Sequence, residues 1–205
     1  MGGNITQSQF NKTFKSLNEP DPSYHGVVYT EAMGEAAYIA RARVVPLRNM
    51  GAAISPMNSF MIMQGIETLP IRMDRHCENA IAIANYLSTH DKVSWVRYAG
   101  LPDHADYDLL KKYCGGRAAS ILSFGIKGGA VAGGNFIDAL GLFTRLVNIG
   151  DTKSLACHPA TTTHRQLSPE EMTKVGVSDD LVRLSVGIEH IDDLLEDIEQ
   201  ALTKA

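Results

Sequence analysis

The chain has 205 residues, of which 44% are hydrophobic and 20% are charged, and its formal net charge is −4. These values are typical of a soluble globular protein that can bury an ordinary core. The slightly acidic balance gives no support for a nucleic-acid partner or an anionic membrane surface. The length suffices for one large domain or two small ones.

Cysteine usage and the apolar stretches bear on the compartment. The three cysteines, Cys77, Cys114 and Cys157, are odd in number and widely spaced, and they form no CxxC pair. That pattern favours a reduced compartment, so we expect a cytoplasmic protein. No signal peptide is visible, and the most apolar stretch, residues 51–65, is too short and too polar to cross a bilayer.

The first third of the chain contains several helix signals. Residues 1–30 are polar and rich in turn formers, whereas residues 33–50 favour a helix that Pro46 should kink or break. Gly51 is a plausible terminator. Ser55–Pro56 then reads as the N-cap and first residue of a new helix.

The clearest helix is predicted over residues 71–88, directly after Pro70. Its apolar residues recur at spacings of three and four, which predicts a stripe packed on a core. Asn79 falls mainly off that stripe. The stripe consists of Met73, Cys77, Ala80, Ile81, Ala84 and Leu87.

Strands and helices alternate through the second half of the chain. This alternation predicts an α/β domain with helices on a sheet. The acidic residues between 192 and 199 alternate with leucine and isoleucine, which indicates a solvated helix face. The predicted strands are residues 93–98, 119–126 and 181–186, and the predicted helices are residues 104–113, 131–140 and 191–202.

Motif searches exclude several kinds of site. Residues 125–129 are rich in glycine but match no nucleotide-binding loop, so they are interpreted as a turn. No GxSxG nucleophile elbow occurs. His76–Cys77 and Cys157–His158 are adjacent pairs, and neighbouring residues rarely converge on one ion, so no metal site is expected.

Two features leave alternatives open. Residues 148–164 are dense in hydroxyl and imidazole groups, which suits either a functional loop or an ordinary surface loop. Arg183 lies inside an apolar strand. Its guanidinium either points outward to solvent or serves as a planar fork for a carboxylate ligand.

Several segments carry a family resemblance. Residues 179–194 (DDLVRLSVGIEHIDDL) resemble the closing signature of the pyridoxal-phosphate enzymes of cysteine and methionine metabolism, and residues 153–164 are similar to the loop that precedes it. Residues 18–26, 51–58 and 72–80 resemble the O-acetylhomoserine sulfhydrylase branch. The likeness covers essentially the whole chain in one register.

The resemblance implies an α/β fold, namely the C-terminal portion of an aspartate-aminotransferase-type (fold type I) enzyme. Residues 1–66 would be the tail of the cofactor-binding domain with its linking helices. Residues 67–205 would form the small C-terminal α/β domain. Family members form dimers that pair into tetramers, so a homo-oligomer is implied, and residues 54–66 are expected to expose apolar surface in this chain.

The implied activity is γ-replacement in methionine biosynthesis and transsulfuration. Such a transferase makes homocysteine or methionine from O-acetylhomoserine and sulfide or methanethiol, with pyridoxal 5′-phosphate as cofactor. The resemblance does not decide between sulfide and methanethiol as the acceptor, or between O-acetyl and O-succinyl donors. A sister activity (methionine γ-lyase, or cystathionine synthase or lyase) and a non-catalytic stand-alone module derived from the family are the alternatives.

The resemblance also assigns roles to individual residues. Arg183 would hold the substrate α-carboxylate, and Ser154 and the Leu155 backbone would line the substrate site. Thr163 and His164 would order the loop, whereas His158 is interpreted as a satisfied loop histidine.

The Schiff-base lysine of the family lies in a Ser-Ala-Thr-Lys segment, and none of the nine lysines here stands in that context. Residues 2–5 resemble sequence that follows this lysine. We therefore expect no catalytic residue in this chain, no covalent attachment of the cofactor, and no activity of the chain alone.

Overall fold

The structure is a computed structural model that describes residues 13–205, so residues 2–5 lie outside the described part. The chain forms two compact units, Met1–Gln64 and Gly65–Ala205. The assignment of the first unit to the tail of a cofactor-binding domain stays a prediction.

The first unit, as far as it is described, is helical. The predicted helix over residues 33–50 is interrupted near its start by a 3-10 turn, but Pro46 does not end it. Pro46 instead lies in a π-helical turn, which accommodates the missing backbone N–H inside a continuing helix. Gly51 ends the run in a left-handed conformation, as predicted. The elements are α2 (Lys15–Asn18), α3 (Tyr29–Met33), η1 (Gly34–Ala36), α4 (Ala37–Ala42), η2 (Arg43–Leu47) and α5 (Arg48–Met50).

Helix α6 (Pro56–Glu67) begins where the sequence predicts, and the Asn58 backbone N–H donates to the Ser55 hydroxyl at 3.2 Å. None of its residues is buried. A helix that is apolar on every side is normally buried in a larger assembly. Residues 54–66 expose the large hydrophobic side chains of Ile54, Met57, Phe60, Met61, Ile62, Met63 and Ile66.

The second unit is built on a five-stranded sheet in the order β1-β2-β5-β4-β3. All neighbouring strands are antiparallel except β3 and β4, which are parallel. The strands are β1 (Val93–Arg97), β2 (Ile121–Ile126), β5 (Leu181–Ser185), β4 (Leu155–Cys157) and β3 (Thr144–Arg145). The α/β fold class is therefore confirmed.

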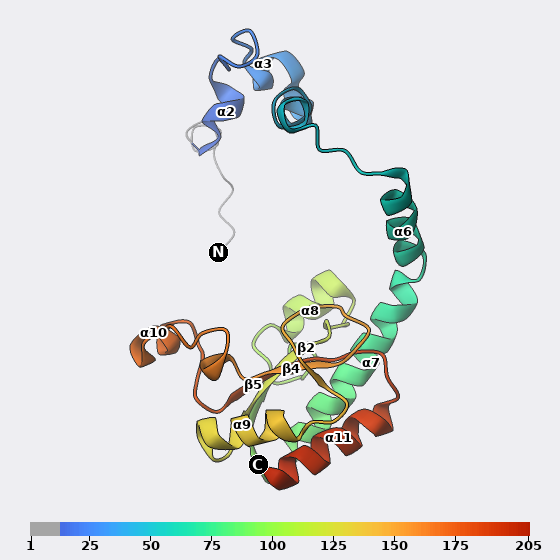
Figure 1. Cartoon of the computed structure of the whole chain (residues 1–205), viewed down its shortest axis with the longest axis vertical. Coiled ribbons are helices and arrows are strands. Elements are labelled where there is room, and N and C mark those ends of the chain that lie inside the picture. The colour runs from blue at the N-terminus through green and yellow to red at the C-terminus, as the bar shows by residue number, and fades with distance from the viewer. Residues whose placement is uncertain (1–12) are drawn as a thin grey trace. The chain divides into compact units, whose positions relative to one another are not determined.

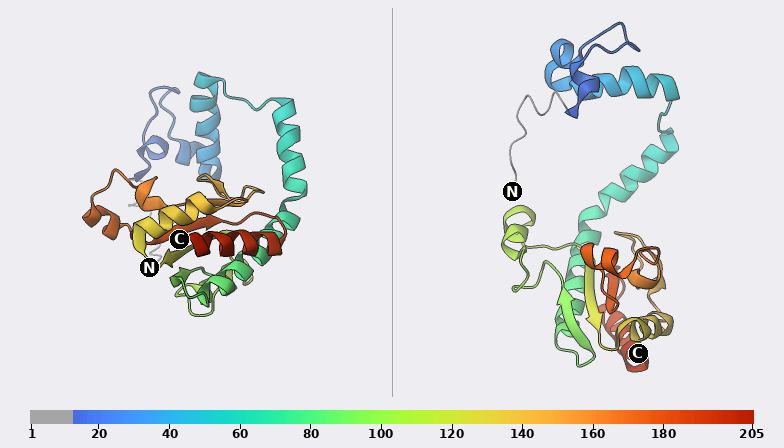
Figure 2. Two further views of the ribbon diagram at one scale, coloured as in Figure 1. Left: turned by 60° about the horizontal axis from the view of Figure 1, so that its bottom comes forward. Right: turned by 90° about the vertical axis from the view of Figure 1, so that its left-hand side faces the viewer.

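Three helices share one core with this sheet, namely α7 (Leu69–Ser88), α9 (Gly129–Ala139) and α11 (Ile191–Lys204). Figure 1 shows α9 and α11 side by side against the strands, and Figure 2 gives two further views of them. Because alternate residues of a strand face opposite sides, Val182, Leu184 and Val186 all enter this core. The remaining elements are α8 (Tyr107–Cys114), η3 (Pro159–Thr161) and α10 (Pro169–Lys174).

Several sequence predictions need correction. The helix predicted over residues 104–113 begins only at Tyr107. Residues 155–157, expected in a loop, form the fully buried strand β4. Asp197 does not lie on a solvated helix face. Its carboxylate is buried and accepts hydrogen bonds from the backbone N–H groups of residues 141–143 at 2.7–3.0 Å.

Within residues 13–205, no helix combines the length and apolar character that a membrane span requires.

The exposed apolar side chains of α6 make self-association of this chain testable. We expect the chain to associate, and we expect Phe60→Gln with Met63→Gln to reduce that association while keeping good helix formers in place. Sedimentation velocity over a range of concentrations measures the effect. Val131→Gln, which removes an isolated apolar side chain that is 74% exposed, is the control. A parent chain that stays monomeric throughout would contradict the prediction.

Candidate functional site

The candidate site lies on the sheet face opposite the three helices. Val182 and Leu184 point into the core, so Arg183 between them points to the other face. The strand register places Arg97, Ser123, Arg183 and Cys157 in one row across β1, β2, β5 and β4. Adjacent members of the row are one strand spacing apart, about 4.8 Å.

Arg183 is half-buried and has no carboxylate partner within ion-pair distance among residues 13–205. Its Nη2 donates to the Asn148 carbonyl at 3.5 Å, a long and weak hydrogen bond. Burial raises the pKa of the neighbouring Cys157 thiol, and the Arg183 guanidinium opposes that rise. Cys157 is therefore a neutral neighbour, and the guanidinium remains able to pair with an anion.

The strands around Arg183 are joined by a hydrogen-bonded cluster centred on Glu189. The Ser154 backbone N–H donates to Glu189 Oε1 at 2.6 Å, and the Ser154 hydroxyl donates to Oε2 at 2.9 Å. The Gly187 N–H in turn donates to Ser154 Oγ at 2.8 Å. A side chain at position 187 would overlap Glu189 and Thr152, so only glycine fits there. We call Ser154, Gly187 and Glu189 the Glu189 cluster.

Helix α7 adds two buried polar side chains to this region. Asn79 donates from Nδ2 to the carbonyls of Gly187 at 3.1 Å and Glu189 at 2.9 Å. His76 Nδ1 lies 2.6 Å from the Val186 carbonyl, so this nitrogen carries the proton and donates it. The turn between β5 and α11 is thus held from both α7 and β4.

The predicted site residues fall into different environments. Ser154 is fully buried and its hydroxyl is occupied by the Glu189 cluster, so it orders the chain at the start of β4. The Leu155 side chain is also buried, and Leu155 is paired with Thr144 and Ser185 in the sheet. A substrate-lining role for Ser154 or the Leu155 backbone stays a prediction.

The loop after β4 contains the predicted loop-ordering residues. His158 is buried, and its two ring nitrogens lie 2.9 Å from Thr161 Oγ1 and 2.8 Å from the Asp179 carbonyl, so it is the satisfied loop histidine expected. The exposed Thr163 hydroxyl lies 2.8 Å from His164 Nδ1. Thr163 and His164 therefore interact with each other. No cluster of possible metal ligands occurs within residues 13–205.

The chain matches the family of Cys/Met metabolism PLP-dependent enzymes over residues 1–203. The chain belongs to this family. The matched residues include strand β5 with Arg183 and the Glu189 cluster beside it. Enzymes of this family act in cysteine and methionine metabolism, so the substrates of the family are amino acids.

Relatives support the same identification. The chain is 48% identical to O-acetyl-L-homoserine sulfhydrylase 1 of Thermus thermophilus over 91% of this chain and 44% of that protein. It is 46% identical to homocysteine synthase of Schizosaccharomyces pombe over 99% of this chain and 47% of that protein. The chain thus spans less than half the length of these relatives.

A solved structure shows the same fold. The putative O-acetylhomoserine (thiol)-lyase of Campylobacter jejuni, solved with N′-pyridoxyl-lysine-5′-monophosphate, superposes with a TM-score of 0.83 at 39% identity. The match covers 92% of this chain and 45% of that chain. The resemblance to fold type I enzymes is therefore confirmed.

Two lysines of the second unit have their side-chain nitrogens bound to backbone carbonyls. Lys92 Nζ donates to the carbonyls of the last helical turn at 2.7–3.2 Å, and Lys127 Nζ donates to the Asp91 carbonyl.

Sequence reasoning missed Glu189, Asn79 and His76. Asn79 seemed to lie off the apolar stripe of α7, and His76 was weighed only as a metal ligand. The available signal was their spacing of three residues, which places both on one helix flank next to the core stripe. Their partners are backbone carbonyls more than one hundred residues away, which no local pattern reveals.

Two buried serines, Ser154 just before β4 and Ser185 in β5, allow a matched test of the Glu189 cluster. Ser154→Ala should destabilise the second unit by about 1–3 kcal/mol, because it leaves the Gly187 N–H and one Glu189 oxygen unpaired. Ser185→Ala should be nearly neutral, since the Ser185 hydroxyl is buried without a partner. Urea unfolding followed by the fluorescence of Trp95, the single tryptophan, measures both. Equal effects of the two substitutions would refute the cluster's role.

Proposed function

We propose that this chain is the C-terminal part of a PLP-dependent O-acetylhomoserine sulfhydrylase, which makes homocysteine or methionine by γ-replacement with sulfide or methanethiol. The observation that carries the proposal is Arg183, a half-buried guanidinium without an anionic partner on the open sheet face of a family member. The names of the Thermus and Schizosaccharomyces relatives support the substrate choice.

The residues of this chain would serve the substrate side of the reaction. Pyridoxal phosphate, when bound by the intact enzyme, supplies the electron sink for breaking bonds next to the amino carbon. Arg183 would bind the α-carboxylate through two parallel hydrogen bonds and so fix the orientation of the amino acid. Within the Glu189 cluster, Glu189 and Gly187 would hold Ser154, and with it the Leu155 backbone, beside that site.

The exposed α6 segment supports an assembled enzyme. Seven exposed large apolar side chains within residues 54–66, six of them on α6, would be costly in a free protomer, so we propose that the intact enzyme buries this segment in a homo-oligomer, a dimer or a tetramer. No part of this proposal requires nucleic acid or a membrane.

A chimera tests the carboxylate role of Arg183. The chimera joins the part of the Thermus relative that this chain does not match to the N-terminus of this chain. It should make homocysteine from O-acetylhomoserine and sulfide. Arg183→Ala should lower kcat/KM about 30-fold or more, which corresponds to about 2 kcal/mol, while the cofactor absorbance persists, and Arg183→Lys should rescue only part of the loss. Arg97→Ala, in the same row two strands away, is the control and should have little effect. An unchanged kcat/KM for Arg183→Ala would return this residue to the surface-arginine interpretation.

A second measurement concerns the chain by itself. We expect the 205-residue chain to form no covalent adduct with pyridoxal phosphate and to show no sulfhydrylase activity, because none of its nine lysines stands in the Ser-Ala-Thr-Lys context of the family's Schiff-base lysine. Borohydride reduction followed by peptide mapping should find no uniquely labelled lysine. One lysine labelled in stoichiometric yield, together with a visible cofactor band, is the contrary result.

A further inference from the structure

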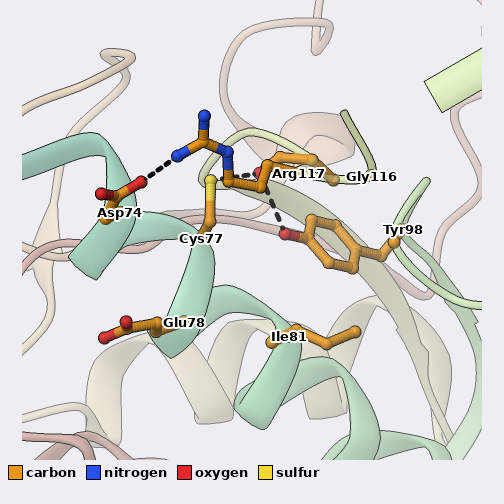
Figure 3. A pocket seen from close by; sticks show the side chains of 9 residues that line it. Asp74, Cys77, Glu78, Ile81, Tyr98, Gly116 and Arg117 are labelled. Atoms are coloured by element: carbon orange, nitrogen blue, oxygen red, sulfur yellow. Dashed lines mark hydrogen bonds and ion pairs between the residues drawn. The ribbon is translucent and has the colours of Figure 1, made fainter. Parts of the chain in front are cut away.

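A pocket of about 280 Å³ lies away from the Arg183 row, between α7 and the segments that follow β1 and α8. Figure 3 shows α7 supplying Asp74, Cys77, Glu78 and Ile81, at helical spacings of three and four. Tyr98, Gly100 and residues 116–118 form the opposite wall. The volume is close to the lower limit of small-molecule sites, about 300 Å³, so a small ligand would fill it.

The interior of the pocket suits an apolar group. The Cys77 thiol donates to the Ala118 carbonyl at 2.6 Å, and the Tyr98 hydroxyl donates to the Ala119 carbonyl at 2.9 Å. Burial raises the pKa of the Cys77 thiol, which keeps it a neutral donor. With these polar groups already paired, a polar ligand group inside would lose its hydrogen bonds to water without replacement. The Tyr98 ring, Ile81 and the Cys77 sulfur offer favourable contacts instead.

Two glycines shape the walls. A Cβ at Gly100 would lie 2.6 Å from Tyr98 Cε1, so the ring rests directly on the Gly100 backbone. Gly116 has a φ of +81°, a conformation that side chains rarely adopt, and it leads directly into Arg117. Backbone geometry at these glycines therefore positions the aromatic wall and the backbone of Arg117.

The mouth of the pocket carries opposite charges. The Arg117 guanidinium forms an ion pair with the Asp74 carboxylate, as Figure 3 shows, and these side chains are 68% and 51% exposed. Such an exposed pair contributes little to stability and opens readily. Glu78, also at the rim, pairs with Arg75 at 3.2 Å. Asp74 and Arg117 can therefore exchange their mutual contact for a ligand that carries both charges.

We propose that this pocket binds a free α-amino acid with a short, uncharged, apolar side chain. Arg117 binds the ligand carboxylate as a planar fork, Asp74 binds the ammonium group, and the side chain fills the space between Ile81 and Tyr98. The pocket shares no residue with the Arg183 row, so this site stands independently of the proposed function.

Titration calorimetry on the 205-residue chain with L-norleucine tests the site. Hexanoate and pentylamine, which each keep the alkyl chain and lack one charge, should bind much more weakly. Arg117→Gln and Asp74→Asn should each weaken norleucine binding about tenfold or more, since each removes a charge-assisted hydrogen bond. Circular dichroism confirms that these exposed-residue variants are folded.

Two control variants sharpen the result. Asp138→Asn removes an ion pair of similar exposure, between Asp138 and Arg145 at 3.0 Å, and should leave binding unchanged. Arg183→Ala should also leave it unchanged. Norleucine binding that is lost in Arg183→Ala but kept in Arg117→Gln would overturn the pocket assignment while supporting the carboxylate role of Arg183. No detectable binding, or hexanoate binding as tightly as norleucine, would also overturn it.

Discussion

The carboxylate of Glu189 fixes the junction on which the second unit depends. It accepts hydrogen bonds from the Ser154 backbone and hydroxyl, so the chain entering β4 is tied to the chain leaving β5. Buried backbone N–H groups at such a junction must be paired, and Gly187 pairs with Ser154 Oγ for this reason. Asn79 then binds the two carbonyls of the same turn, which joins the junction to α7. Removing any one of these groups leaves partners unpaired in a partly buried region.

This junction positions Arg183 through the sheet register. Ser185 pairs with Leu155 next to the cluster, and that pairing sets Cys157 opposite Arg183 two residues further along. A slip of one residue would turn Arg183 into the core and Leu184 out of it, at a large cost in buried charge and lost apolar burial. The guanidinium is thus held on the open face by the packing of Val182 and Leu184 against the helices.

The sequence predicted those parts of the fold that follow local rules. The apolar stripe of α7, the glycine that ends the helix at residue 51 and the Ser55 cap all depend on neighbours within a few residues. Strand β4 was not predicted because it is only three residues long and is flanked by the polar residues Ser154 and His158. Asp197 escaped because its partners, the backbone of residues 141–143, approach it only in the folded chain. Arg183 could be singled out from its apolar surroundings, whereas the lack of a carboxylate partner depends on which side chains the fold places nearby.

Helix α7 shows how one element serves two regions. Each residue of an α-helix is rotated by about 100° from the one before, so Asp74, Cys77, Glu78 and Ile81 form one flank and His76, Asn79 and Ile83 form another. The first flank lines the pocket, while His76 and Asn79 bind the turn after β5 and Ile83 enters the core. The hydrogen bonds and core contacts fix the helix along its length and around its axis. Two hydrogen bonds cross from this flank to the opposite wall of the pocket, one between Cys77 and the Ala118 carbonyl and one between Arg117 and Asp74. The position of the pocket wall is otherwise set by the contacts that fix the helix. The same rigidity that orients the strand of Arg183 also keeps the pocket open.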